Sequence, residues 1–342
     1  MTPLSRRQFL AAASSAILLP WDTPAFAAPP ALRLGTLAPR GSIYHRTLLE
    51  VGQAWRGAEA PGARFTVYAG GSQGGEASLV RRMRIGQLNG AMMSAVGLIE
   101  IDRATAALQL LPMMFRSWDE VDAAGRRVRP MIERQMAERG FVVLYWAEAG
   151  WVRFFSKRPA LLPDDFKRLK MFAWAGDPAQ VHLMTSLGYQ PVVLETADIL
   201  PGLQTGLIDA VPANASWALA SQIDTIAPYM LDLRWVPIVG ATVLTRASWT
   251  ALSAAGREAL RGGARRATAE LKAVRESTDR DAIEAMRQRG LKVQTLTPQA
   301  RDAWLRLAES VYPRIRGTTV PAEMFDAVQA ALSAYRGVKA AQ

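Results

Sequence analysis

The sequence contains no cysteine and only two histidines, His45 and His182, in 342 residues. The absence of cysteine excludes disulfide bonds, thiolate metal sites and a cysteine nucleophile. It also suits an oxidising compartment, in which a free thiol is a liability. The two histidines lie far apart, and no HExxH pattern or carboxylate cluster at metal spacing accompanies them. We therefore expect no zinc site, no cofactor and no enzymatic activity.

Long basic runs are also missing, although the formal net charge is +11. The densest basic groups are short pairs such as Arg81-Arg82, Arg126-Arg127 and Arg265-Arg266, without interleaved aromatic residues. The glycine-rich stretch GGSQGGE (70–76) lacks the Gly-Lys-Ser/Thr ending of a phosphate-binding loop. We therefore expect the charge to be spread over solvated faces, with no nucleic acid and no nucleotide as a partner.

The first 27 residues have the pattern of an export signal. Ser5-Arg6-Arg7-Gln8-Phe9-Leu10 is a twin-arginine motif, an apolar run follows to Pro20, and Ala25-Phe26-Ala27 is a small-x-small cleavage site. A plain Sec signal with two chance arginines is the alternative, and its destination is also outside the cytoplasm. No later apolar stretch is long enough to cross a membrane, so we expect a soluble mature protein in the periplasm.

Strands and helices alternate along the mature chain, which predicts an α/β protein with helices on the faces of its sheet. The strands are expected at 31–37, 64–68, 86–94, 142–146, 151–156, 170–174, 191–194, 208–211, 240–245 and 291–296. The expected helices include 43–55, 79–85, 180–187 and 199–206, two separate long helices at 249–261 and 263–289, and a turn from Pro163 capped by Asp164 or Asp165.

Two such α/β halves, with the chain passing back and forth, indicate a two-lobed binding protein with a hinge and an interlobe cleft. We expect lobe I to contain residues 31–149 and 239–282. Lobe II is then expected to contain residues 150–238 and 283–336. Ligands of open α/β sheets bind at the carboxyl ends of the strands, so the cleft residues should follow strand ends.

Four segments, in order and spacing, resemble the solute-binding proteins of TRAP (tripartite ATP-independent periplasmic) transporters. They are GGSQGGEASLVRRMRIGQLNGAMMS (70–94), LLPMMF (110–115), SKRPALLPDDFKRLKMF (156–172) and LQTGLIDAV (203–211). The resemblance covers about residues 32–334. It implies a periplasmic receptor, monomeric or dimeric, that closes on a small organic acid and delivers it to TRAP membrane permease subunits.

The resemblance also implies where the ligand is held. Most members of the family have an arginine that pairs with the ligand carboxylate at the position of Phe172. A second frequent arginine of the family falls at or within one position of Arg153. The chain therefore resembles a divergent member whose ligand has a larger apolar or aromatic part. Arg153 is the candidate anchor, and a structural ion pair with Glu148 or Asp177 is the alternative.

The other candidate residues each have two interpretations. Phe172 and Trp174 share one strand face and either fill the core or form the cleft wall. Trp151 is a surface aromatic or a stacking platform, and Asn214, with Trp217 beside it, contacts the ligand or caps a loop. The remaining candidates for the cleft are Trp235, which could close over it, and Ser42, Tyr44 and Ser94, for which turn or cap roles are the alternative.

Two other functions remain open at this point. Without an arginine at position 172, the receptor could bind a neutral or cationic amphipathic ligand through cation–π contacts with Trp151 or Trp174. The protein could also be an accessory or sensory binding protein that is not coupled to uptake. A secreted enzyme on the same scaffold is disfavoured by the absence of cysteine and of paired histidines.

Overall fold

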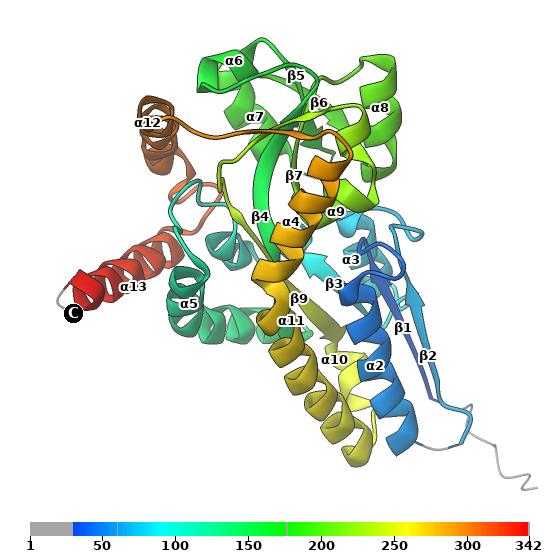
Figure 1. Ribbon diagram of the computed structural model, residues 1–342. Coiled ribbons are helices and arrows are strands. Elements are labelled where there is room, and N and C mark those ends of the chain that lie inside the picture. Colours follow the sequence, from blue (N-terminus) through cyan, green and yellow to red (C-terminus); the bar gives the residue numbers. More distant parts are fainter. Residues whose placement is uncertain (1–29, 60, 176, 341–342) are drawn as a thin grey trace, which may run out of the picture.

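The computed structural model describes residues 30–59, 61–175 and 177–340. The expected export signal at residues 1–27 lies outside this part of the chain. Strands and helices form an α/β fold in which one mixed sheet runs through both halves of the molecule (Figure 1). The strands are β1 (Ala31–Thr36), β2 (Arg64–Tyr68), β3 (Gly90–Ser94), β4 (Phe141–Ser156), β5 (Lys170–Trp174), β6 (Gln190–Leu194), β7 (Ala210–Asn214), β8 (Tyr229–Leu231), β9 (Pro237–Thr245) and β10 (Lys292–Gln294).

Helices cover the faces of this sheet. They are α2 (Ile43–Ala58), α3 (Glu76–Arg84), α4 (Ala95–Leu98), α5 (Trp118–Glu138), α6 (Pro163–Lys167), α7 (Pro178–Ser186), α8 (Ile199–Thr205), α9 (Ala215–Ala220), α10 (Arg246–Thr250), α11 (Ala254–Gln288), α12 (Pro298–Ile315) and α13 (Ala322–Ala340). Short 3₁₀ turns lie at η2 (Arg103–Leu108), η3 (Thr196–Asp198) and η4 (Ile223–Thr225).

The strand order is β2-β1-β3-β9-β4-β7-β5-β6, and β8 and β10 extend the second half through β4. β1 pairs in parallel with β2 and β3, and β5 pairs in parallel with β6 and β7. Between these parallel groups, β9 and β4 pair antiparallel with their neighbours. The two parallel groups are therefore joined by two long strands that pass from one half to the other. Two of the predicted lobe boundaries fall within these strands and the third falls within α11, and all three stay a prediction.

Strand β4 is continuous over 16 residues, whereas the sequence predicted two strands with a break between them. Its first part pairs with β9 and its last five residues pair with β7, with register shifts at Val143/Tyr145 and Glu148/Trp151. Gly150 lies at the second shift with φ +92°, a conformation that a residue with a Cβ rarely adopts. The AEAG segment is therefore an irregularity inside one strand.

Helix α11 is also continuous, which corrects the prediction of two long helices separated near Gly262. A Cβ at Gly263 would lie 3.2 Å from the Cα of Val51 in α2, so the glycine allows the two helices to pack closely. This packing offsets the low helix propensity of glycine. Figure 1 shows α11 running from the second half down along α2, so α11 also connects the halves.

Helix α6 begins differently from the prediction of an aspartate cap. Its N-cap is Leu162 and Pro163 is its first residue. The Asp165 side chain lies inside the first turn and accepts the backbone N–H groups of Leu161 at 3.0 Å and Leu162 at 2.8 Å. The Asp165 carboxylate thus accepts hydrogen bonds from the backbone that leads into α6, and Asp165 is not the N-cap residue itself.

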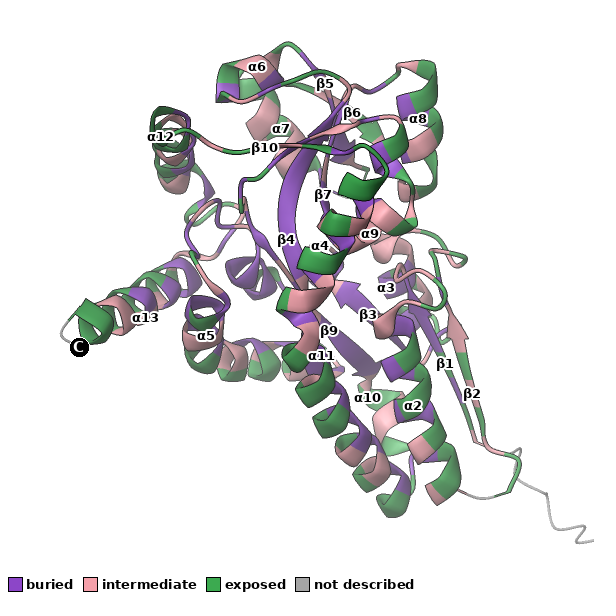
Figure 2. Ribbon diagram, viewed as in Figure 1, coloured by how far each residue is buried: buried purple, intermediate pink, exposed green. Residues whose placement is uncertain are grey.

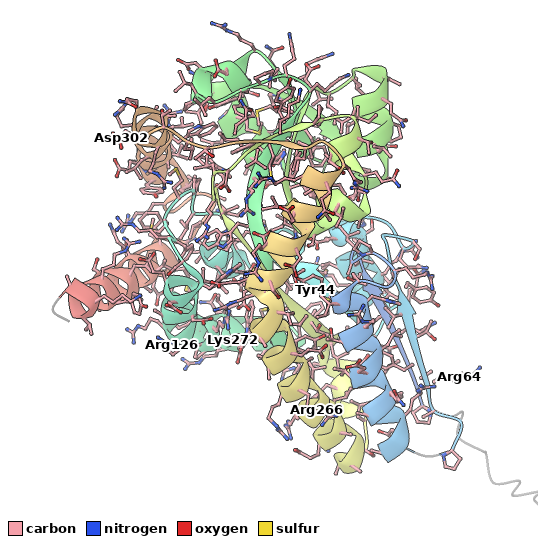
Figure 3. All side chains as sticks on the ribbon, viewed as in Figure 1. Tyr44, Arg64, Arg126, Arg266, Lys272 and Asp302 are labelled. Atoms are coloured by element: carbon pink, nitrogen blue, oxygen red, sulfur yellow. The ribbon has the colours of Figure 1, made fainter. Side chains whose placement is uncertain are left out.

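The buried residues follow the sheet. β3, β4 and β7 are buried along most of their length, and the outer faces of α2 and α11 are exposed (Figure 2). Basic residues such as Arg64 and Arg266 point outward from the molecule (Figure 3). Within the described residues, no helix is both long and apolar enough to span a bilayer.

Candidate functional site

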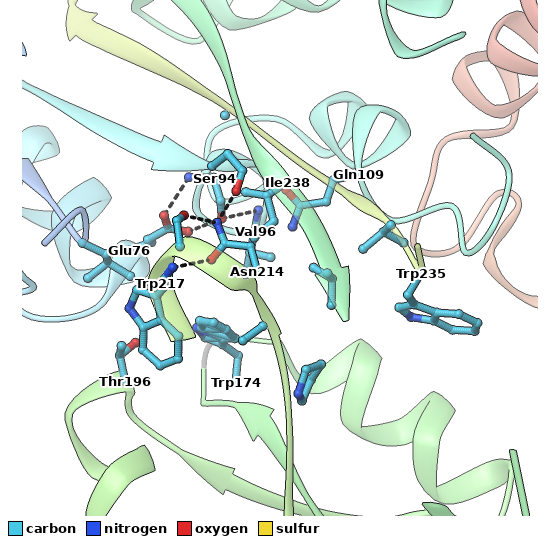
Figure 4. A pocket seen from close by; sticks show the side chains of 18 of the residues that line it. Glu76, Ser94, Val96, Gln109, Trp174, Thr196, Asn214, Trp217, Trp235 and Ile238 are labelled. Atoms are coloured by element: carbon cyan, nitrogen blue, oxygen red, sulfur yellow. Dashed lines mark hydrogen bonds between the residues drawn. The ribbon is translucent and has the colours of Figure 1, made fainter. Parts of the chain in front are cut away.

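A cavity of about 770 Å³ lies between the two halves. The parallel strands β1 and β3 end at it with Thr36 and Ser94, and β5 and β7 of the other half end at it with Trp174 and Asn214. Figure 4 shows Ser94, Asn214, Trp174 and Trp217 around one part of this space and Trp235 at another. The cavity thus lies at strand carboxyl ends, where α/β folds bind ligands.

The cavity wall is mainly apolar. Among the described lining residues, only Arg46, Glu76 and Asp177 carry a formal charge at neutral pH. Asp177 is buried and caps α7 by accepting the N–H of Gln180 at 2.9 Å. Burial raises the pKa of Asp177, and the hydrogen bond from Gln180 opposes this effect. Arg46 is thus the one cationic side chain of the described wall.

Glu76 holds Ser94 in place. The backbone N–H and the hydroxyl of Ser94 donate to the two oxygens of the Glu76 carboxylate, each at 2.6 Å (Figure 4). Burial raises the pKa of Glu76, while these bonds and one from Gly97 favour the ionised form. The Ser94 oxygen also accepts the N–H of Val96 at 3.2 Å. Ser94 therefore lines the cavity and also has the predicted cap role.

Asn214 has the cap role of one of its two predicted interpretations and also lines the cavity, while a contact with the ligand stays a prediction. It is the last residue of β7, which starts and ends later than predicted, rather than part of the loop after Val211. Its Oδ1 accepts the N–H of Trp217 at 3.2 Å, and its Nδ2 donates to the carbonyl of Ala149 in β4. Asn214 and the half-buried Trp217 both line the cavity. Since its amide is bonded on both sides, Asn214 is a rigid part of the wall.

Phe172 and Trp174 are in edge-to-face contact, with ring centroids 4.8 Å apart. Phe172 is only 1% exposed and packs in the core of the second half with Ile199 and Leu203. Both rings also contribute to the cavity wall, and Trp174 is half-buried. The two interpretations of Phe172 are therefore not exclusive, because the core of this half reaches the cavity.

The structure does not bring Arg153 or Trp151 to the cavity, which corrects the prediction of Arg153 as the carboxylate anchor. Side chains alternate across a strand, and here Val152 and Phe154 line the cavity. Trp151 and Arg153 therefore lie on the other face of β4. Arg153 is 5% exposed and forms ion pairs with Asp279 at 2.6 Å and Asp232 at 3.1 Å. The alternative of an ion pair is observed, with partners other than Glu148 or Asp177.

Arg153 belongs to a group of buried and half-buried charges that joins β4, α5 and α11. We call this group the α11 joint; its members are Asp122, Glu148, Arg153, Arg275 and Asp279. Arg275 pairs with Asp122 at 2.9 Å and with Glu148 at 3.6 Å. Burial raises the pKa of Asp279, while the charge of Arg153 opposes this effect. Among the described residues, Asp279 Oδ1 has no hydrogen-bond partner.

Trp151 packs in the same region, with its ring centroid 4.8 Å from that of Trp118. It is 2% exposed, so it is neither a surface aromatic nor a stacking platform of the cavity. The guanidinium of Arg234 lies 5.6 Å from the centroid of the Trp151 ring. The expectation of a ligand contact by Trp151 is therefore wrong for this arrangement, because protein groups occupy its surroundings.

The remaining predicted residues all line the cavity. Ser42 is the N-cap of α2 and accepts the N–H of His45 at 3.3 Å. The Tyr44 hydroxyl donates to the carbonyl of Glu148 at 3.1 Å, and burial raises the pKa of Tyr44. Trp235 packs against Trp304, with ring centroids 5.5 Å apart. Ser42 and Tyr44 thus combine cap or bridging roles with a place in the wall.

Sequence reasoning missed Arg46, Gln109 and Trp304. Arg46 lies four residues after Ser42, so helical spacing could have placed it on the same face of α2. Its Nη1 donates to the carbonyl of Gly41 at 3.1 Å. Gln109 Oε1 accepts the N–H of Val239 at 3.1 Å, and Figure 4 shows its side chain directed into the pocket. No local signal marks Gln109 or Trp304, because both reach the cavity only through the fold.

The loop between β2 and α3 contains Gly70-Gly71-Ser72-Gln73-Gly74, which matches the Gly-x-Ser-x-Gly pattern of hydrolases by letter. Ser72 is exposed and does not line the cavity. In the described part of the chain, no hydrogen bond joins Ser72 to a histidine, so the arrangement lacks the base that would activate a serine nucleophile. No group of three or more potential metal-ligating side chains is found there either.

The family of the chain follows from a match to the model of bacterial extracellular solute-binding proteins, family 7, over residues 34–317. The chain belongs to this family, which includes the solute-binding proteins of TRAP transporters. Its members are solute-binding receptors rather than enzymes. The chain is 22% identical to the C4-dicarboxylate-binding periplasmic protein of Rhodobacter capsulatus over 65% of its own length, and spans 66% of the length of that relative.

Solved structures have the same fold. A Bordetella pertussis extracytoplasmic solute receptor binding pyroglutamic acid superposes with a TM-score of 0.80 at 16% identity, over 89% of this chain and 99% of that one. A TRAP periplasmic solute-binding protein of Shewanella oneidensis with bound succinate superposes with a TM-score of 0.81 at 18% identity, over 89% and 100% of the two chains. These likenesses confirm the predicted two-lobed fold of a periplasmic solute-binding protein.

Proposed function

We propose that the protein is the receptor of a TRAP-type transporter that captures a small organic acid with an apolar or aromatic part. In this proposal it delivers the acid to membrane permease subunits. The observation that carries the proposal is the wall of the cavity between the halves: it is mainly apolar, and its described residues include one arginine. Polar ligands with several charges would lose more hydration there than they regain.

Arg46 is the proposed anchor of the ligand carboxylate. Guanidinium binds carboxylates through paired N–H donors, and only part of the Arg46 guanidinium is engaged, by the carbonyl of Gly41. Ser42 lies one helical turn earlier. Its hydroxyl oxygen accepts the N–H of His45, so the hydroxyl proton remains to be donated to a ligand. Arg46 and Ser42 together supply a charge and a hydrogen bond to the cavity wall.

Isothermal calorimetry against a panel of aromatic, aliphatic and keto acids tests the proposal. Each acid is paired with its uncharged amide as a matched ligand. We expect binding of acids with an apolar body and a loss of at least about tenfold in affinity for the amide, the size of one charged hydrogen bond. If no acid binds, or if the small dicarboxylates bind best, the proposed ligand class is wrong.

A second candidate is a receptor for a neutral or cationic amphipathic ligand. It is favoured by the two carboxyl groups in the wall, Glu76 and Asp177, against the single Arg46. The half-buried ring of Trp174 could also stack on a cation. This candidate predicts that amides or amines bind at least as tightly as the corresponding acids, so the same titrations separate the two functions.

Export and coupling to uptake belong to the same proposal. We expect the twin-arginine route, so replacing Arg6 and Arg7 by lysine should keep the protein in the cytoplasm in a fractionation experiment. Retained export would instead indicate a plain Sec signal. An accessory or sensory role would be indicated by binding without uptake when the receptor is combined with TRAP membrane subunits in vesicles. Size-exclusion chromatography with light scattering distinguishes a monomer from a dimer.

A further inference from the structure

Helix α7 is unusual in having no buried residue among its described positions. Its apolar side chains Leu183 and Met184, and Leu187 just after it, are half-buried and line the cavity. Leu183 and Leu187 also pack against the core cluster that includes Val311 and Ile315, and Met184 packs against the cluster that includes Trp304. The apolar face of α7 is therefore held by neighbouring core residues and contributes to the cavity wall.

Another part of the wall comes from α12 and from Trp235. Trp304 and Leu307 of α12 line the cavity, and Trp235 packs against Trp304. The indole nitrogen of Trp304 donates to the carbonyl of Leu161 at 2.9 Å, so this ring has no free donor to offer a ligand. We call the space bounded by Leu183, Met184, Leu187, Trp235, Trp304 and Leu307 the α7–α12 compartment.

The compartment is continuous with the polar part of the cavity. Helix α7 starts four residues after Trp174, which lines the part of the cavity near Asn214 and Trp217. Figure 4 shows Trp235 on the other side of the pocket from Trp217 and Asn214. None of the six residues that define the compartment is charged. The compartment therefore extends the site from the part near Asn214 and Trp217 without offering a charge.

We propose that the α7–α12 compartment binds the hydrocarbon tail of the acid, and that the ligands are amphipathic monocarboxylates of medium chain length. This inference rests on the proposed function and specifies its ligand class. The whole cavity of about 770 Å³ lies within the range of roughly 300–1,000 Å³ that is typical for drug-sized ligands. A second carboxylate placed in the compartment would lose its hydration without gaining a cation.

Chain length is the first experimental variable. Calorimetric titration of the full-length mature protein with butanoate, hexanoate and octanoate should show affinity that rises about threefold to fourfold per methylene group, as expected for burial of apolar surface. Octanoate should then bind on the order of 100-fold more tightly than butanoate. Octanedioate, which carries a carboxylate at both ends, should lose most of this gain.

Filling the compartment is the second variable. Met184→Trp should weaken octanoate binding by at least about tenfold while leaving butanoate within about twofold, since only the longer tail needs the space. Thr185→Trp is the matched control, because Thr185 is the next residue of α7 but is exposed and does not line the cavity. A thermal melt confirms that each variant is folded. If Met184→Trp does not fold, Leu187→Ser replaces it, with the same expected selectivity.

The possible outcomes separate this inference from the proposed function. Affinity that is independent of chain length, or a Met184→Trp variant that weakens butanoate and octanoate equally, overturns the tail compartment but leaves an acid receptor in place. A protein that binds no acid of the wider panel overturns the proposed function, and the inference is overturned with it. Rising affinity with chain length that Thr185→Trp also abolishes would place the tail outside the compartment.

Discussion

The two faces of strand β4 differ in whether the charged side chains near them form ion pairs. Val152 and Phe154 face the interlobe cavity, where a single arginine stands in an apolar wall. Trp151 and Arg153 face α5 and α11, where the charges of the α11 joint pair with one another. Both faces combine arginine with aromatic rings, so composition alone does not distinguish them. The pairing of the charges indicates a structural role for one face, and the proposed binding function concerns the other.

The difference has a physical reason. A buried charge needs a partner within the protein, and in the α11 joint each arginine faces a carboxylate. Arg46 is exposed, so it can stay without a carboxylate partner among the described residues at little cost. A close pair of opposite charges between two secondary-structure elements therefore indicates structure, whereas a lone charge at the rim of an apolar cavity indicates a ligand.

The largest effect is expected for Phe172→Arg. Phe172 is 1% exposed, so the change buries an unpaired charge and removes a packed ring. We expect a loss of about 5 kcal/mol or more in the free energy of unfolding, comparable to the total stability of many domains. Urea denaturation followed by circular dichroism measures this loss.

Trp174→Arg is the matched control for Phe172→Arg, because Trp174 is half-buried on the same strand face. It should fold and should shift the preference of the receptor towards small, highly charged acids. If Phe172→Arg also folds with nearly the wild-type midpoint and shows the same shift, core packing of Phe172 contributes little to stability and its main role is in the cavity wall.

Arg153→Met tests the structural role of the other face. It leaves Asp279 buried without its partner and should reduce the free energy of unfolding by about 3 kcal/mol while the affinity for acids stays the same. Asp232→Asn, which removes the exposed partner of Arg153, should cost less than about 1 kcal/mol. Denaturation and calorimetry on each variant provide both readouts.

Two results would change this interpretation of Arg153. A selective loss of acid binding in a stable Arg153→Met variant would restore Arg153 as the anchor. The double variant Arg153→Met/Asp279→Leu should recover part of the lost stability, because it also removes the uncompensated charge. Without any recovery, the ion pair is not the reason for the loss.

Arg46→Gln should lower the affinity for acids and leave stability unchanged, whereas Arg153→Met should lower stability and leave the affinity unchanged. The affinity for carboxylates should fall about tenfold, equivalent to about 1.4 kcal/mol, with little change in stability because Arg46 is exposed. Arg56→Gln, an exposed arginine in the last turn of the same helix, is the control for general electrostatic effects. Equal effects of the two substitutions would show that Arg46 acts only through net charge.

The smallest effect concerns pH. Burial opposes ionisation of Asp122, but hydrogen bonds from Arg275 and Lys272 outweigh it and lower the pKa of Asp122 below its usual 3.8. The unfolded state therefore binds a proton at higher pH than the folded state does. The stabilisation is present above pH 3.8 and is lost as the pH falls through the lowered folded pKa.

In Asp122→Asn the free energy of unfolding should depend less on pH in acid. Urea denaturation between pH 5 and pH 2.5 measures this dependence, over a window of roughly one to two units around the usual aspartate pKa. Asp119→Asn is the control, since Asp119 is exposed on the same helix. An unchanged pH dependence in Asp122→Asn would mean that another carboxylate dominates the loss of stability in acid.

Much of the fold was predictable because its signals are local. The alternation of strands and helices, the capping serine at position 42 and the helix after it need only neighbouring residues. The division into two strands at residues 147–150 and into two helices at Gly262 was wrong, since both segments are held continuous by their partners. Contacts with distant parts of the chain override weak local breaks.

The site was predictable in part for the same reason. Ser94, Trp174 and Asn214 are the last residues of their strands, and the carboxyl ends of parallel strands in one half must lie at a common edge. The resemblance located the arginine of the second half only to within one position, and in a strand one position changes the face. The place of Arg153 therefore depended on a register that the sequence did not specify.

The sequence alone determined the class of the protein: its α/β order and its family are both properties of the linear chain. Tertiary structure decided what faces the ligand. It turned Arg153 to the α11 joint, brought Trp304 of α12 beside Trp235, and left Arg46 as the cation of the described cavity wall. These outcomes depend on strand register and on contacts between distant segments, which local patterns do not encode.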